Sequence, residues 1–118
     1  MIQLFFATVR TAPERRDPAR IAELRDAAHA ALTILDAHLA DRAHVCGPAF
    51  TMGDIPLGCI VYRYFNVEVA RPPLPHVEAW HARLAQRPAY RDHVMRPFGT
   101  NPDEWAALER ASASEGVP

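Results

Sequence analysis

Histidine and cysteine side chains are the groups in this chain that could bind a metal or act as a nucleophile. Six histidines are present, with His76 and His81 five residues apart and His29 and His38 nine apart. Neither spacing places two imidazoles on one helical face, and the chain has no His-Glu-x-x-His pattern. We therefore expect no metal site and interpret the histidines as ordinary surface residues.

The two cysteines, Cys46 and Cys59, provide thiols without an evident activating group. Cys46 lies close to His44 in a connecting segment, but no lysine and no predicted helix N-terminus adjoins it to favour a thiolate. It is therefore either a reactive thiol or, as its surroundings favour, a bystander. Cys59 falls in an apolar run and is expected to pack in the core. A glycine-flanked nucleophile elbow and a phosphate-cradling loop are both absent, so we assign no catalytic residue.

The most informative motif spans Phe50–Gly58 and has the form of a helix start. Thr51 can be the N-cap, its hydroxyl accepting from the backbone N–H of Asp54, while the Asp54 carboxylate reaches back to the N–H of Thr51. Phe50 and Ile55 are placed to form a hydrophobic staple across the same turn. Taken alone, such a capping box marks a helix boundary and implies no chemistry.

The composition describes an ordinary globular chain of 118 residues that is long enough to bury a core. Hydrophobic residues make up 49%, charged residues 23%, and the formal net charge is −1. This near-neutral balance argues against nucleic acid or an anionic membrane as a partner. Two cysteines are too few for a disulfide framework, and neither a secretory signal nor a membrane-spanning run is found. We therefore expect a protein of the cytoplasm.

The spacing of apolar residues predicts an all-α chain of five to six helices, with no need for a β-strand. Prolines, glycines and capping residues set the boundaries of these helices. The third is apolar nearly all round, which predicts a buried central helix, and Pro56 within it predicts a slight kink or a bound water. We expect Ser112–Pro118 to fray. The predicted helices are Met1–Thr11, Pro18–Asp41, Met52–Phe65, Pro75–Arg87, Pro88–Met95 and Pro102–Ala111.

The order of these signals resembles the C-terminal, all-helical domain of the glutathione S-transferases. In that family a capping box and staple begin a central buried helix and serve folding rather than catalysis. The resemblance implies one helical domain over residues 1–118, in which 1–97 are family-like and 98–118 form a C-terminal extension. It is closest to bacterial, theta-like members, and the residues that carry it besides the box are Ile34-Leu35-Asp36-x-x-Leu39, Gly47-Pro48, Arg71-Pro72, Leu74-Pro75, Trp80, Arg83-Leu84 and Arg87-Pro88.

The same resemblance implies a substrate-binding role for the first helix. In theta-like relatives an arginine at the end of this helix faces the active-site cleft, and Arg10 holds that position here. A guanidinium there would stabilise the glutathione thiolate or a departing anion. Phe5, Phe6 and Val9 would line the apolar electrophile pocket. The alternative is that Arg10 is a solvated cation complementing the helix dipole and that the phenylalanines belong to the core.

The family's glutathione-binding, thioredoxin-like domain has no counterpart in these residues. The chain is therefore expected to contribute the hydrophobic electrophile site and dimer contacts for glutathione conjugation only when such a domain is supplied. It would bind no cofactor tightly, with glutathione as a cosubstrate, and would be inactive alone. The alternatives are a stand-alone, non-enzymatic module for dimerisation or interaction, and a truncated gene product that still folds.

A helical domain without its thioredoxin-like partner should expose apolar surface where that partner docks. Such a surface favours association. We therefore expect a homodimer or higher oligomer, with Met1–Val9 taking part, or docking of a partner that carries a thioredoxin-like domain.

Overall fold

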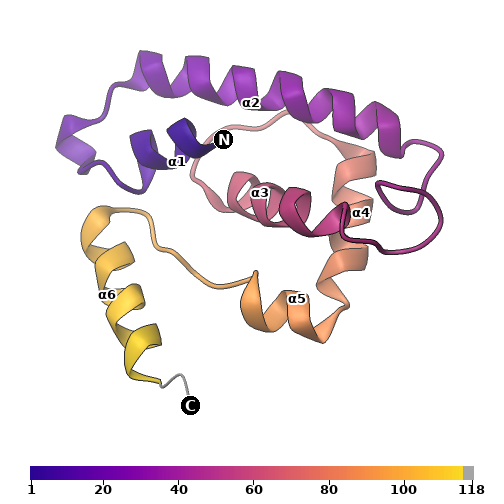
Figure 1. Ribbon diagram of the computed structural model, residues 1–118. Helices are drawn as coiled ribbons and strands as arrows, with labels where there is room; N and C mark the ends of the chain where they lie inside the picture. The colour runs from indigo at the N-terminus through magenta and orange to yellow at the C-terminus, as the bar shows by residue number, and fades with distance from the viewer. Residues whose placement is uncertain (116–118) are drawn as a thin grey trace.

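The computed structural model describes residues 1–115, which contain six α-helices, one short 3-10 helix and no β-strand (Figure 1). The all-α prediction is therefore confirmed. Helix α6 continues to Ser114 rather than ending near Ala111, because Ala111 and Ala113 favour the helix and neither glycine nor proline interrupts its last turn. The remainder of the segment expected to fray, residues 116–118, lies outside the described residues. The elements are α1 (Ile2–Thr8), η1 (Pro13–Arg15), α2 (Pro18–Leu39), α3 (Asp54–Asn66), α4 (Pro75–Ala85), α5 (Pro88–His93) and α6 (Pro102–Ser114).

Side-chain caps define the starts of the two helices that the sequence marks most clearly. The Asp17 carboxylate accepts hydrogen bonds from the backbone N–H groups of Ala19 and Arg20, the second and third residues of α2, at 3.0 and 3.3 Å. Asn101 does the same for α6, at 3.1 and 3.0 Å. In α6 the Glu104 carboxylate also reaches back past the cap and accepts from the N–H of Thr100, the residue before Asn101, at 2.7 Å. Local residue types are enough to place both ends.

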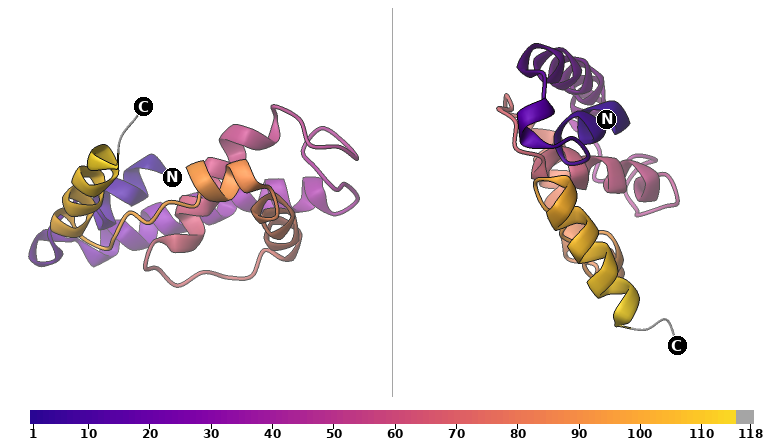
Figure 2. Two further views of the ribbon diagram at one scale, coloured as in Figure 1. Left: turned by 90° about the horizontal axis from the view of Figure 1, so that it is seen from below. Right: turned by 90° about the vertical axis from the view of Figure 1, so that its left-hand side faces the viewer.

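The helices form a flat body with principal extents of 43 × 43 × 17 Å. Helix α2 runs along one side, α1 packs beside its N-terminal half, and α3 lies in the middle (Figure 1). Helix α4 crosses the far end, in contact with both α2 and α3. Helix α6 extends away from the other helices, as Figure 1 and the right-hand view of Figure 2 show. The short α1 therefore covers only part of the length of α2.

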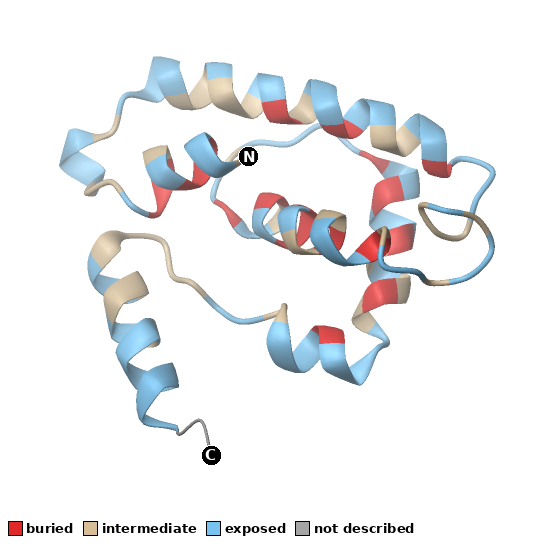
Figure 3. Cartoon of the chain, in the orientation of Figure 1, coloured by how far each residue is buried: buried red, intermediate tan, exposed pale blue. Residues whose placement is uncertain are grey.

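The core lies where α1, α2, α3 and α4 face one another, as the buried positions in Figure 3 show. The hydrophobic side chains that are at most 2% exposed there are Leu4, Val9, Val61, Tyr64, Val67, Val77, Trp80 and Leu84. Gly58 permits this packing, because a Cβ at that position would lie 2.9 Å from Leu84 Cδ1 and 3.0 Å from Tyr90 Cε2. Tyr90 also donates its hydroxyl to the Gly58 carbonyl at 2.8 Å.

Helix α3 differs from the prediction in two ways. It is not buried on all sides, since Ile55 is 49% and Ile60 39% exposed, because no other described helix covers that face. It also begins at Asp54 rather than Met52. Pro56 consequently lies in the first turn, where a helix N–H has no intrahelical acceptor and proline is tolerated.

Candidate functional site

The four candidate residues at the end of α1 divide into two buried and two exposed side chains. Phe5 and Val9 are 5% and 2% exposed and belong to the core. Phe6 is 52% exposed, and Arg10 is also exposed. The first pair is therefore positioned mainly by packing, while the second pair is free to meet a ligand.

Arg10 is held by aromatic rings rather than by a carboxylate. Its guanidinium carbon lies 3.9 Å from the centroid of Trp105 and 5.2 Å from the centroid of Phe6. Both distances fall within the range of cation–π attraction. Trp105 belongs to α6, so the stack joins the first and last helices of the described chain. The sequence pattern placed Trp105 on a helix but offered no sign that it would meet Arg10.

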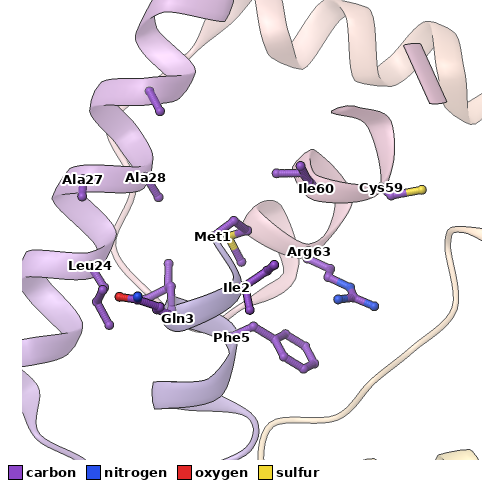
Figure 4. Close-up of a pocket in the computed structure, with 12 residues that line it drawn as sticks. Met1, Ile2, Gln3, Phe5, Leu24, Ala27, Ala28, Cys59, Ile60 and Arg63 are labelled. Atoms are coloured by element: carbon purple, nitrogen blue, oxygen red, sulfur yellow. The ribbon is translucent and has the colours of Figure 1, made fainter. Parts of the chain in front are cut away.

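A cleft of about 610 Å³ lies between α1, the middle of α2 and α3. Figure 4 shows the side chains that line it, with small residues of α2 facing the first residues of α1 and the exposed side of α3 opposite. Ile2 and Ile60 on its walls are 71% and 39% exposed. Large apolar side chains this exposed around one cleft are typical of a surface that another molecule covers. The labelled lining residues are Met1, Ile2, Gln3, Phe5, Leu24, Ala27, Ala28, Cys59, Ile60 and Arg63.

A second cleft, of about 300 Å³, lies between α3, the segment that follows α5, and α6. Trp105 lines it together with Phe98, whose ring meets Phe5 edge-on with centroids 5.2 Å apart. Phe5, Cys59 and Arg63 line both clefts. The Arg63 guanidinium stands 5.0 Å from the centroid of Phe5. The two clefts thus adjoin at α3, and the Arg10–Trp105 stack stands at the edge of the second one.

The capping-box residues lie at the other end of α3, around the fully buried carboxylate of Asp54. Asp54 accepts from the N–H of Thr51 at 2.9 Å, as the motif predicts. The Thr51 hydroxyl, however, accepts from the N–H of Gly53 at 3.2 Å rather than from Asp54. This difference follows from geometry, since the N–H of Asp54 already bonds the carbonyl of Thr51.

Two partners of Asp54 come from outside its motif. Val45 donates its backbone N–H at 3.1 Å and Trp80 donates its indole N–H at 2.7 Å. His44 Nδ1 lies 3.4 Å from the carboxylate without forming a hydrogen bond. Burial would raise the pKa of Asp54, but the bonds from Thr51, Val45 and Trp80 together hold it below its usual value. Asp54 is therefore a charged structural hub that joins α3, α4 and the connector before the box.

The staple residues show contacts that the motif does not include. The Arg87 guanidinium lies 3.7 Å from the ring centroid of Phe50, and His44 meets the same ring edge-on at 6.1 Å. Ile55 stays 49% exposed. Phe50 is therefore packed by Arg87, which lies between α4 and α5, and by His44 of the preceding connector.

The structure corrects one histidine prediction and one cysteine prediction. His81 is not a surface residue: it lies among the rings of Tyr62, Phe65 and Tyr90, and burial lowers its pKa. Its spacing from Val77 and Leu84, four residues before it and three after it, places it on the inner side of α4. Cys59, expected in the core, is only half-buried, because it borders both clefts.

The part of the chain that the structure describes contains neither a cluster of metal ligands nor a helix suited to cross a membrane. No three histidine, cysteine or carboxylate side chains among residues 1–115 come together to hold a metal ion. None of the helices in that range combines the length and apolar character that a membrane crossing requires.

Comparison with known proteins relates most of the chain to one family. Residues 18–83 match the family model described as glutathione S-transferase, C-terminal domain. Glutathione S-transferase GstB of Escherichia coli K12 is 37% identical over 94 residues, which cover 80% of this chain and 45% of the relative. GstB of Escherichia coli O6:H1 matches equally well.

A solved structure is similar to this chain in both sequence and fold. The theta class glutathione S-transferase of the citrus canker pathogen Xanthomonas axonopodis pv. citri, with glutathione bound, gives a TM-score of 0.76 at 46% identity. The match covers 80% of this chain and 50% of that one. Its apo form gives a TM-score of 0.77 at 45% identity. The chain thus spans about half the length of the relatives it matches.

Proposed function

Since the chain belongs to the glutathione S-transferase C-terminal domain family, we propose that it supplies the hydrophobic electrophile site for glutathione conjugation when a thioredoxin-like domain is present. The observation that carries this proposal is the exposed stack of Arg10 between Phe6 and Trp105. It puts a cation and the exposed Phe6 ring next to Trp105, which lines the second cleft, and such a combination suits a hydrophobic electrophile with a departing anion.

Each residue of the stack has a separate role in this proposal. Phe6 and Trp105 offer ring surfaces to the apolar body of the electrophile. The Arg10 guanidinium offers donors to the thiolate sulfur or to the leaving anion, whose negative charge it stabilises. Activation of the thiol and most contacts to glutathione fall to the thioredoxin-like domain. The helical chain by itself holds no cofactor tightly in this proposal.

The domain arrangement is part of the same proposal. Residues 1–97 form the family-like helical domain, and 98–118 form an extension that carries the Trp105 side of the electrophile site. Two free cysteines, Cys46 and Cys59, suit a reducing compartment such as the cytoplasm. The near-neutral net charge favours neither nucleic acid nor an anionic membrane as a partner.

The test compares the chain alone with a chimera in which the unmatched N-terminal portion of GstB precedes it. Glutathione binding is measured by isothermal titration, and conjugation of chlorodinitrobenzene is assayed on the same samples. We expect turnover from the chimera but not from the chain alone. Arg10→Gln should lower kcat/KM, while Arg15→Gln, at an exposed arginine of η1, serves as the matched control. A folded chimera that binds glutathione but is indifferent to Arg10→Gln would overturn the assignment of Arg10.

A second role, in self-association, is favoured by the exposed Ile2 and Ile60 at the first cleft. We propose that the isolated chain forms a homodimer or higher oligomer through this surface, with Met1–Val9 contributing. Sedimentation of the chain should show the oligomer, and Ile2→Asp should shift it toward the monomer. A monodisperse monomer at high concentration would contradict the proposal.

A further inference from the structure

Arg16 joins two segments that are far apart in the sequence. It is half-buried in the loop between α1 and α2. Its Nε donates to the carbonyl of Thr11 at 3.1 Å, and its Nη2 donates to the carbonyl of Thr100 at 2.5 Å. Thr11 closely follows α1, and Thr100 immediately precedes the cap of α6. A planar guanidinium with donors in fixed directions is well suited to hold two carbonyls in one arrangement.

The connector before α6 is also anchored by Phe98, which lies two residues before Thr100 and meets Phe5 and Tyr62 edge-on, with ring centroids 5.2 and 6.1 Å apart. None of the residues of α6 is buried, and the helix packs through half-buried side chains such as Trp105 and Leu108. Arg96 contacts Ser112 and Glu115, but it precedes α6 on the same connector and makes these contacts at the exposed surface. These contacts therefore do not attach the helix to α1.

The turn whose carbonyl Arg16 binds is itself tied to the first turn of α6. Gly99 has a φ of 72°, and a Cβ there would lie 2.6 Å from Glu104 Cβ, so the chain folds tightly back on the first turn of α6. Both the N–H and the hydroxyl of Thr100 donate to Glu104, at 2.7 and 3.0 Å. Because these bonds tie Thr100 to the first turn of α6, a hydrogen bond to the Thr100 carbonyl also constrains the direction in which α6 leaves.

We propose that Arg16 is a positioning residue that sets α6 against α1 and thereby holds Trp105 over Arg10. The inference rests on the proposed function only in assigning the Arg10–Trp105 stack to the electrophile site. Arg16 itself touches no substrate. Its loss would leave Trp105 free to move from the guanidinium, and the site would lose one of its walls.

The two tryptophans allow a test that needs no enzymatic activity. With 5-fluorotryptophan incorporated, the fluorine resonance of Trp105 reports the stack, and that of the fully buried Trp80 reports the core. We expect Arg16→Gln to shift the Trp105 resonance and to increase its broadening by a soluble paramagnetic agent, with Trp80 unchanged. Arg15→Gln, one residue earlier and exposed, should alter neither resonance.

The other outcomes are equally informative. An unchanged Trp105 resonance in Arg16→Gln would overturn the proposal, and so would equal changes at both tryptophans, which indicate general destabilisation. If the glutamine variant is too unstable, Arg16→Lys keeps the charge and is expected to move Trp105 partway. A Trp105 response to Arg16→Gln together with an active chimera indifferent to Arg10→Gln would refute the proposed electrophile site while leaving the positioning role intact.

Discussion

The Asp36 carboxylate on α2 accepts a hydrogen bond of 2.9 Å from the backbone N–H of Val77 on α4, 41 residues further along the chain. The same oxygen accepts from the N–H of His76 at 2.8 Å. Leu74, the residue at the cap position of α4, provides no side-chain cap of its own. Asp36 therefore caps α4 from a different helix.

Asp36→Ala should lower the free energy of unfolding by about 1 kcal/mol, the size of a lost helix cap. Two backbone donors at the start of α4 would lose their acceptor, and the carboxylate would no longer complement the helix dipole. Asp41→Ala, at an exposed aspartate just past the end of α2, is the control and should change little. Urea unfolding measures both, and equal stability of the two variants would contradict the capping role.

Asp54→Ala should destabilise the fold by about 3 kcal/mol, because it leaves the buried donors of Val45 and Trp80 without an acceptor. Thr51→Ala should cost about 1 kcal/mol or less, since only the bond from Gly53 is lost. The lowered pKa of Asp54 adds a pH dependence: its contribution is present above the unfolded value of 3.8 and is lost as the pH falls below it. An unchanged melting temperature for Asp54→Ala would contradict the structural role assigned to the Asp54 carboxylate.

His81 should make the fold less stable in mild acid. Burial lowers its pKa in the folded state, so around and below pH 6.5 the unfolded chain binds more protons than the folded chain. The free energy of unfolding is therefore highest above pH 6.5, where His81 is neutral in both states, and it declines as the pH falls toward the folded-state pKa of His81. His81→Phe should flatten this decline between about pH 7.5 and about pH 5 in urea titrations, whereas His76→Gln, an exposed control, should leave it. If the His81→Phe variant still lost stability over this pH range, the pH dependence would belong to another titratable group.

Gly58→Ala should destabilise the chain by roughly 1 to 3 kcal/mol, the usual range for overpacking a core. The new methyl would meet Leu84 Cδ1 and Tyr90 Cε2 inside normal contact distance. Leu84→Val removes one of these contacts, so the double variant should be more stable than the sum of the two single changes predicts. Strict additivity in thermal unfolding would show that α3 and α4 do not press together at this point.

The amino-acid sequence alone determined the helices and the features that depend on neighbours along the chain. Asp17 and Asn101 cap α2 and α6 as their residue types predict, and the bond from Thr51 to Asp54 forms within one turn. The order of these signals was also enough to indicate the family. Each of these features involves groups within a few residues of one another, so local propensity and short hydrogen bonds decide them.

Only the tertiary structure decided which distant groups meet. Trp80 reaches Asp54, Asp36 reaches α4, Arg16 reaches Thr100, and Trp105 covers Arg10. The tertiary structure also placed His81, predicted to be a surface residue, among aromatic rings. It left one face of α3, predicted to be buried, uncovered. Helical periodicity shows that a side chain lies on a given face, but the partner of that face depends on how separate helices cross and on which surfaces remain uncovered.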